Sequence, residues 1–224
     1  MLVTPAHQYP TGGVLPPLRR AALVDWARRR DAIVIEDDYD AEYRYDREPI
    51  GCIQGLAPDH VVYAGSASKT LAPGLRLGWL VVPGALAGPI AEAKLAFDNG
   101  SPTLDQLTFA DFLSRGEQDR HLRRMRPIYR QRRDALHASL AVHLPQLRPA
   151  GSAAGLHLLA WLPEDVDETV VIERAAERGV GVYGLGSYWQ DPTGRRGGLI
   201  FGYAGVAESA IREGVALLAG VLEP

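Results

Sequence analysis

Cysteine is almost absent from this chain of 224 residues, and its scarcity excludes two kinds of protein. The single cysteine, Cys52, can form neither a disulfide within the chain nor a cysteine cage for zinc, and it fits a reducing, cytoplasmic compartment. An excess of one charge is also lacking. With 24 basic and 27 acidic residues the net charge is −3, which gives the chain no electrostatic basis for binding nucleic acid or an acidic membrane.

Long hydrophobic runs are missing as well. Residues 1–13 contain no basic segment followed by an apolar run, so we expect no signal peptide. The longest uncharged stretch, residues 77–91, is interrupted by glycine and proline and falls short of the ~20 apolar residues that a membrane helix needs. With 46% hydrophobic and 23% charged residues, the composition is that of a globular protein, which we expect to be soluble and intracellular.

Short apolar runs alternate with helical patterns along the chain, which is typical of α/β proteins. Runs at 32–35, 60–64 and 77–82 predict buried parallel strands. Three strands are few for such a sheet, and no strand–helix unit precedes the first helix, so we expect the chain to be the later part of a longer protein. Helices are expected at 17–30, 86–97, 105–113, 118–144 (with a kink or break at Pro127), 168–178 and 208–222, and further strands at 155–162, 180–183 and 199–203.

An acidic run, Glu36 to Asp40, directly follows the first of these strands. Its carboxylates should therefore lie at the carboxyl end of the strand, where open α/β sheets bind ligands. One carboxylate there could hold a protonated heterocyclic nitrogen, and Tyr39 could reach a phenolate oxygen. Two alternatives stay open: an acidic turn that caps the next segment, and a metal site built from the D-x-D pair Asp38 and Asp40.

Lys69 lies in a second candidate segment, between hydroxyl-bearing residues and with Arg76 seven positions further on. Such a lysine can form a Schiff base with a carbonyl, while Ser66, Ser68 and Arg76 could converge on a phosphate. The Lys-Thr pair invites a nucleotide-binding P-loop interpretation. That motif requires glycines at the positions that Tyr63 and Ser68 occupy, so the P-loop interpretation is weak.

Three motifs occur in a fixed order: the Pro-Thr-Gly turn at 10–12, the strand ending in Glu-Asp-Asp-Tyr-Asp at 36–40, and the Ser-x-Ser-Lys-Thr-Leu run at 66–71. Together they resemble the pyridoxal 5'-phosphate (PLP) enzymes of the fold-type I class I/II aminotransferase family. The His-Gln-aromatic-Pro-Thr-Gly version at 7–12 resembles, more specifically, the aminotransferase-like domain of MocR-type regulators. These are bacterial transcription factors of the GntR superfamily that carry an N-terminal winged helix-turn-helix.

The resemblance implies an α/β fold. Residues 1–125 would form the C-terminal part of the PLP-binding large domain, a three-layer α/β/α sandwich, and residues 126–224 a small C-terminal α+β domain. It also implies a PLP site. Lys69 would be the catalytic residue and form the Schiff base, while Asp37 would pair with the pyridine nitrogen. The other cofactor-binding residues would be Tyr39 on the ring oxygen and Ser66, Ser68 and Arg76 on the phosphate, with no metal.

Two positions depart from the aminotransferase pattern. Tyr9 stands immediately before Pro-Thr-Gly, where aminotransferases usually have an asparagine that contacts the ring oxygen. Ile200 aligns with the arginine that grips the α-carboxylate of a substrate, and the nearby Arg195 and Arg196 are poor substitutes. Binding of the cofactor is therefore better supported than transamination.

The resemblance implies a PLP-binding, effector-sensing domain of a MocR-type regulator, truncated so that it lacks its winged-helix domain. The expected partners are a small amino compound and, in the full-length protein, a second copy in a homodimer, with DNA bound only through the missing domain and no membrane contact. A working aminotransferase that acts on an amino acid is the alternative, in which Lys69 would also shuttle the proton. A metal-dependent transferase that uses Asp38 and Asp40 is a distant third.

Overall fold

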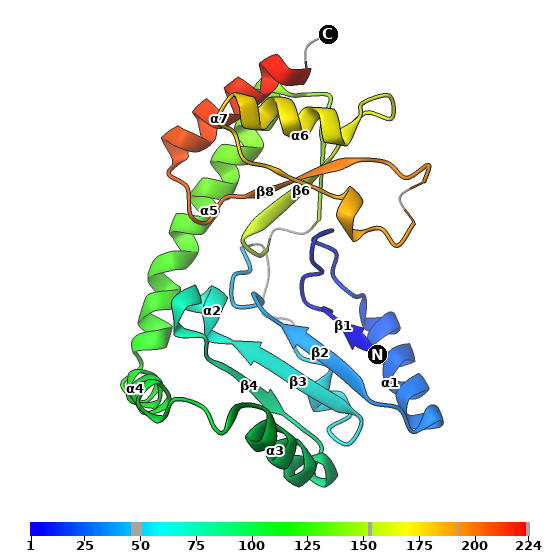
Figure 1. Ribbon diagram of the computed structural model, residues 1–224, viewed down its shortest axis with the longest axis vertical. Coiled ribbons are helices and arrows are strands. Elements are labelled where there is room, and N and C mark those ends of the chain that lie inside the picture. The colour runs from blue at the N-terminus through cyan, green and yellow to red at the C-terminus, as the bar shows by residue number, and fades with distance from the viewer. Residues whose placement is uncertain (46–50, 152–153, 192, 223–224) are drawn as a thin grey trace. The chain divides into compact units, whose positions relative to one another are not determined.

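The computed structural model describes residues 1–45, 51–151, 154–191 and 193–222 (Figure 1). The chain forms two compact units. The first comprises Met1–Gln8 and Gly13–Arg124, and the second comprises Tyr9–Gly12 and Met125–Pro224. Within the described residues, no helix is both long and apolar enough to span a bilayer.

The first unit is built on a four-stranded sheet in the order β1-β2-β3-β4. The strands β1, β2 and β3 are parallel, and β4 runs antiparallel to β3. The strand predicted at 77–82 is therefore not parallel, since it starts at Gly78, directly opposite Ser66. The connection at 67–77 falls just short of the dozen or more residues that a crossover to a parallel strand requires. The strand is not buried either, because all four residues of β4 are exposed. The bounds are Leu2–Val3 for β1, Val34–Asp38 for β2, Val61–Ser66 for β3 and Gly78–Val81 for β4.

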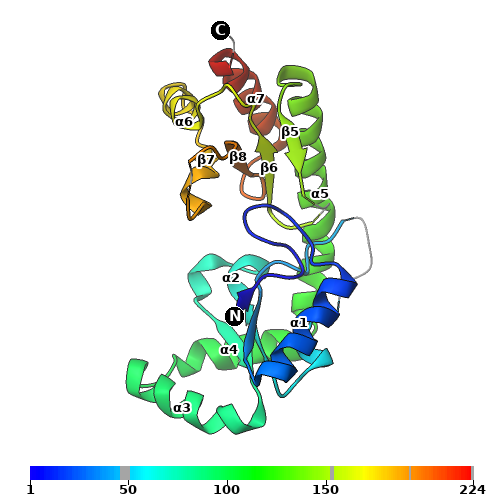
Figure 2. The ribbon, with the colours of Figure 1, turned by 90° about the vertical axis from the view of Figure 1, so that its right-hand side faces the viewer.

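One face of this sheet carries the core of the first unit. The helix α1 (Pro17–Arg30) begins with a proline, whose fixed φ suits a first helical residue, and lies beside the sheet (Figure 2). Its Val24 and Ala27 belong to one buried cluster with Val34 of β2 and Val61 of β3. Side chains alternate along β2, so Val34 and Glu36 are buried on this face while Ile35 between them is exposed.

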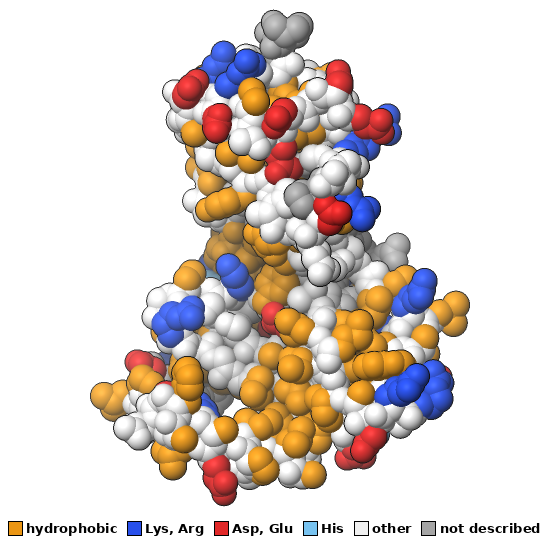
Figure 3. Space-filling model, turned by 45° about the vertical axis from the view of Figure 1, so that its right-hand side comes forward, with side chains coloured by type: hydrophobic (Ala, Val, Ile, Leu, Met, Phe, Trp, Pro, Cys, Tyr) orange, Lys and Arg blue, Asp and Glu red, His pale blue; other side chains and the backbone are white. Residues whose placement is uncertain are grey.

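Apolar side chains lie uncovered elsewhere on the first unit. Leu2 of β1 is 65% exposed, its partner Ile35 on β2 is exposed, and so is Leu80 on β4 at the other edge of the sheet. The helices α3 (Gly84–Asp98) and α4 (Thr103–Ser114) bury none of their described residues, and Phe97 of α3 is 93% exposed. Figure 3 shows hydrophobic side chains gathered over this unit.

The second unit has an antiparallel sheet in the order β5-β6-β8-β7. The strand β5 was not expected from the sequence, and the strand expected at 180–183 is reduced to the two residues of β7. The helix α5 runs unbroken through Pro127, so the break considered there does not occur. The elements are α5 (Glu117–His143), of which the residues from Met125 on belong to this unit, β5 (Arg148–Ala150), β6 (His157–Trp161), α6 (Glu168–Glu177), β7 (Tyr183–Gly184), β8 (Gly198–Gly202) and α7 (Glu208–Leu222).

Glu168, the first residue of α6, fastens this helix to the sheet of the second unit. Its Oε2 accepts the backbone N–H of Leu185 at 3.0 Å and that of Gly198 at 2.8 Å, and its Oε1 accepts that of Gly186 at 2.8 Å. A Cβ at Gly184 would lie 2.1 Å from Oε1, so only glycine fits there without a shift of the carboxylate. One side chain thus satisfies backbone donors at the start of β8 and just after β7.

We expect Glu168→Ala to lower the free energy of unfolding by about 2–3 kcal/mol, because it leaves the part-buried N–H groups of Gly186 and Gly198 without this acceptor. Glu173→Gln, on the exposed side of the same helix, is the matched control and should change the stability by less than about 0.5 kcal/mol. Denaturant unfolding of the two variants measures this difference. Equal stability of both variants would show that the Glu168 contacts contribute little.

Candidate functional site

In the acidic run at the end of β2, some carboxylates accept hydrogen bonds that stabilise the fold and one does not. Buried Glu36 accepts the backbone N–H groups of Ile53 and Gln54, both at 2.9 Å. Asp38 accepts the hydroxyl of Tyr63 at 3.0 Å. These two carboxylates point to the same face of β2 and each already has a partner in the fold, so neither is a candidate for holding a ligand.

Asp37 points to the opposite face of β2 and differs from its neighbours. It pairs across the sheet with Ala64 of β3 and is half-buried. Within the described part of the chain, its carboxylate makes no hydrogen bond or ion pair. Burial raises the pKa of Asp37 above its usual value, and the negative charge of Asp40 raises this pKa further. A carboxylate in this state gains most from a cationic hydrogen-bond donor placed beside it.

The metal interpretation of the D-x-D pair loses support from the same geometry. Asp38 is held by the Tyr63 hydroxyl, and Asp40 by Nδ1 of His7 at 3.0 Å. A divalent cation prefers several oxygen ligands directed at one point, whereas these two carboxylates face different partners. The pair thus serves the fold of the first unit.

Lys69 lies just beyond the carboxyl end of β3, in the short helix α2 (Ala67–Thr70). Its side chain is exposed, and among the described residues its ammonium group has no hydrogen-bond or ion-pair partner. Because β2 and β3 are parallel and in register, Asp37 and the Ser66–Lys69 segment occur at the same end of the sheet. The sequence-predicted lysine and carboxylate therefore lie on neighbouring strands.

The loop after α2 returns Arg76 to the same end of β3. The backbone N–H of Ala67 donates to the carbonyl of Leu77 at 3.0 Å, and Gly78 pairs with Ser66. Arg76 itself has φ 50°, in the left-handed region that side-chain-bearing residues adopt at a cost of about 1–3 kcal/mol. Such strain is concentrated at binding sites, where it directs a side chain that the regular backbone would not present.

The two serines of this segment are not equivalent. The hydroxyl of Ser66 caps α2 by accepting the N–H of Ser68 at 3.1 Å, and it donates to the carbonyl of Leu77 at 3.4 Å. Its oxygen and its proton are therefore already used by the loop. The Ser68 hydroxyl and the exposed Arg76 guanidinium are better placed to hold an anion, and Ser66 shapes the loop that presents them.

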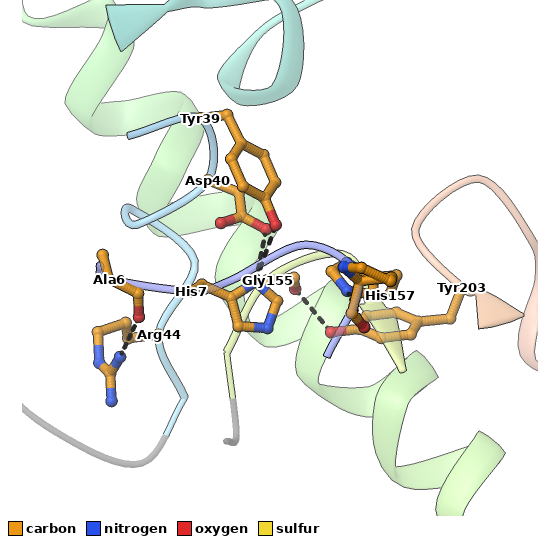
Figure 4. A network of polar contacts seen from close by, with 9 residues as sticks. Ala6, His7, Tyr39, Asp40, Arg44, Gly155, His157 and Tyr203 are labelled. Atoms are coloured by element: carbon orange, nitrogen blue, oxygen red, sulfur yellow. Dashed lines mark hydrogen bonds and ion pairs between the residues drawn. The ribbon is translucent and has the colours of Figure 1, made fainter. Parts of the chain in front are cut away.

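Tyr39 is the remaining candidate of the first unit, and its surroundings contain a residue that sequence reasoning missed. Its hydroxyl lies 3.3 Å from Nδ1 of His7, which also bonds to Asp40 (Figure 4). His7 is 2% exposed and Asp40 1% exposed. The only signal in the sequence is that His7 begins the His-Gln-aromatic-Pro-Thr-Gly motif, which lies well before the acidic run.

Trp79 was also missed as a shaping residue. A Cβ at Gly65 would lie 2.4 Å from the Trp79 indole, so the ring of β4 packs directly on the backbone of β3 next to Ser66. The same ring stacks with Phe109 of α4 at a centroid distance of 6.2 Å. The glycine before Ser66 is therefore required by packing.

The two positions that depart from the aminotransferase pattern both belong to the second unit. The Tyr9 hydroxyl lies 3.0 Å from that of Tyr188, and its ring meets His157 edge-on at 4.9 Å. Burial raises the pKa of Tyr9 to about 12, aided by the hydrogen bond with Tyr188. Ile200 of β8 is buried against Leu159 and Leu185.

Arg195 and Arg196 are engaged elsewhere and do not take the place of an arginine at position 200. Arg196 donates to the carbonyl of Leu162 at 2.7 Å and lies over the Trp161 ring. Arg195 lies over the Trp189 ring at 5.3 Å. Neither arginine is therefore a direct replacement for a carboxylate-binding arginine on β8.

Residues 1–187 match the family of aminotransferase class I and II, and the chain belongs to this family. It is 37% identical over 217 residues to the uncharacterized HTH-type transcriptional regulator YhdI of Bacillus subtilis, covering 96% of this chain and 46% of that protein. It is also 37% identical to the HTH-type pyridoxine biosynthesis transcriptional regulator PdxR of Corynebacterium glutamicum, covering 95% and 46%. The chain thus spans about half the length of the curated relatives it matches.

Among solved structures, the chain is similar to LysN, the α-aminoadipate aminotransferase of Thermus thermophilus, which was crystallised with N-(5'-phosphopyridoxyl)-L-leucine. The TM-score is 0.90 and the identity 28%, over 99% of this chain and 58% of that one. This likeness confirms the expected fold, a partial large α/β domain followed by a smaller α+β domain. The resemblance to MocR-type regulators is likewise confirmed by the regulator relatives.

The raised pKa of Asp37 predicts how its charge affects stability. The folded protein holds the Asp37 proton more tightly than the unfolded chain does, so ionisation of Asp37 disfavours the folded state. We expect Asp37→Asn to raise the free energy of unfolding of the cofactor-free protein at pH 7 by at most about 0.5 kcal/mol, because solvent screens the charge of a half-buried carboxylate. This gain should shrink as the pH falls through the raised pKa and vanish below about pH 4.

Thermal melts over a pH series measure this effect. The control is Asp25→Asn, which removes an exposed carboxylate on α1 and should leave the melting temperature unchanged at every pH. A loss of stability in Asp37→Asn at neutral pH would mean that the carboxylate supports the fold instead.

Proposed function

We propose that this chain is a PLP-binding, aminotransferase-like domain that senses a small amino compound on behalf of a transcriptional regulator. The observation that carries the proposal is Asp37. It is a half-buried carboxylate without a partner among the described residues, and it lies on the strand next to the one that leads into Lys69. The similarity to helix-turn-helix regulators, PdxR among them, supports the sensing role.

The residues of the first unit suit the separate parts of PLP. Asp37 would accept a hydrogen bond from the protonated pyridine nitrogen, whose positive charge would offset the cost of burying the negative charge of Asp37. Tyr39 would donate to the ring oxygen, and Lys69 would hold the aldehyde carbon. Arg76 and Ser68 would bind the phosphate, with Ser66 fixing their loop. When bound, PLP supplies an aldehyde that condenses with amines and a ring that withdraws electrons.

Sensing is favoured over turnover by position 200. An isoleucine buried in the core of the second unit offers no charge to a substrate carboxylate. An amino compound could still react with the cofactor and be retained. Its binding would then shift the populations of two arrangements of the protein, by no more than its difference in affinity for them. Transamination of an amino acid is the alternative, supported by the likeness to LysN.

The partners follow from the same relatives. In the full-length protein we propose that a winged-helix domain binds DNA in the cytoplasm, since the aminotransferase-like chain itself has a net charge of −3. We also propose a homodimer, supported by the uncovered apolar residues of the first unit, such as Ile35, Leu80 and Phe97.

Binding of PLP is tested by two substitutions in the full-length protein. We expect Lys69→Ala to abolish the visible absorption that PLP gains when it bonds to a lysine. Arg76→Ala should weaken the affinity for PLP by about 10- to 100-fold, because it removes a charge-assisted contact to phosphate. Arg19→Ala, which removes an exposed arginine of α1, is the matched control and should bind PLP as the wild type does. A Lys69→Ala variant that keeps the full absorption change would overturn the assignment.

Sensing and turnover are separated by a panel of amino acids and amines added to the PLP-loaded full-length protein. A sensor should change its visible spectrum with a member of the panel and change its affinity for operator DNA. It should release keto acid far more slowly than the ~1 s⁻¹ of an ordinary enzyme. Keto-acid formation at about 1 s⁻¹ or faster, with no effect on DNA affinity, would establish the aminotransferase alternative.

A further inference from the structure

His7 is a buried residue that the proposed cofactor contacts do not use. Its Nδ1 lies 3.0 Å from Oδ2 of Asp40 and 3.3 Å from the hydroxyl of Tyr39 (Figure 4). Asp40 and Tyr39 are consecutive in sequence and directly follow β2. One nitrogen of His7 therefore contacts both residues at the point where the strand ends and the candidate site begins.

The backbone that carries His7 is fixed independently of these contacts. The carbonyl of Pro5 accepts from Arg20 at 2.8 Å, and Arg20 also donates to the carbonyls of Leu15 and Gly51. The carbonyl of Ala6 accepts from Arg44 at 3.4 Å. Two arginines thus hold the segment just before His7 and fix where the imidazole meets Tyr39.

Asp40 sets the direction of these hydrogen bonds in the arrangement that we consider. With its carboxylate ionised it can only accept, and Nδ1 of His7 then carries the proton. An Nδ1–H cannot accept from a hydroxyl, so in its contact with Tyr39 the tyrosine oxygen is the acceptor. The proton of the Tyr39 hydroxyl is then directed to an acceptor other than His7. A ligand oxygen that carries negative charge is an acceptor of this kind.

We propose that His7, held in one tautomer by Asp40, is a positioning residue that turns the Tyr39 hydroxyl so that it donates to the ring oxygen of PLP. This inference rests on the proposed function, because it requires that PLP binds with its ring oxygen at Tyr39. In this role His7 acts on the cofactor through Tyr39 and is not a catalytic residue. Its effect should therefore exist only when both the tyrosine hydroxyl and the ring oxygen are present.

The test uses two near-isosteric substitutions in the full-length protein. His7→Asn can place an amide N–H where Nδ1 lies, whereas His7→Gln moves the amide to the position of Nε2. The affinity for PLP, followed by its visible absorbance, should fall about three- to tenfold in His7→Gln and stay within about twofold of the wild type in His7→Asn. His143→Ala, which removes an exposed histidine at the end of α5, controls for the loss of a histidine as such.

Two further measurements distinguish positioning from a general effect on folding. In a Tyr39→Phe background, His7→Gln should cause no additional loss of affinity, because the hydroxyl that it orients is gone. An analogue of PLP with hydrogen in place of the ring hydroxyl should bind equally well to the wild type and to His7→Gln. Thermal melts of each variant establish that the binding data come from folded protein.

Each outcome either supports the inference or removes it. A loss in His7→Gln that persists in the Tyr39→Phe background, or with the analogue, would reduce His7 to a structural role. Equal affinity of wild type and His7→Gln for PLP would also reject the inference while leaving the proposed function intact. If the wild-type protein does not bind PLP at all, the proposed function fails and the role of His7 fails with it.

Discussion

The parallel pairing of β2 with β3 is the constraint on which the candidate site of the first unit depends. Asp37 follows the apolar start of β2, and Lys69 follows the end of β3. Parallel strands end at the same edge of a sheet, so the register Asp37↔Ala64 brings the two segments together without any direct bond between them. A shift of this register by one residue would turn Asp37 to the α1 face and expose Glu36.

Strand alternation also explains how an acidic run can serve two purposes. Glu36 and Asp38 lie on one face of β2. Glu36 accepts two backbone N–H groups and Asp38 accepts a tyrosine hydroxyl, and these bonds stabilise the segments around β2. Asp37, on the other face, points away from these partners, and burial raises its pKa as it raises that of Asp38. The fold thus gives Glu36 and Asp38 partners and leaves Asp37 without one among the described residues. A carboxylate in this state lowers the stability of the protein without a ligand and favours the binding of a cationic ligand group.

The sequence predicted those features whose causes are local. The helices at 17–30 and 208–222 were found at their observed bounds, because apolar periodicity and helix ends are written in neighbouring residues. The direction of β4 was wrong, because it depends on the short return loop that closes through Leu77. The contact of His7 with Asp40 was missed for a similar reason, since the two residues lie 33 positions apart. Contacts between residues so far apart in the sequence produce no local pattern from which they could be predicted.

The remaining question, whether the cofactor is used for turnover, depends on position 200 more than on the lysine. A Schiff-base lysine is needed both to retain PLP and to transaminate, so Lys69 does not distinguish the two roles. A substrate carboxylate, by contrast, needs a charged partner that its competitors lack, and Ile200 is packed among Leu159 and Leu185 instead. Apolar packing at this position strengthens the core of the second unit and removes a contact specific for amino acids. This exchange agrees with the proposed sensing role, in which an amino compound is bound and not converted.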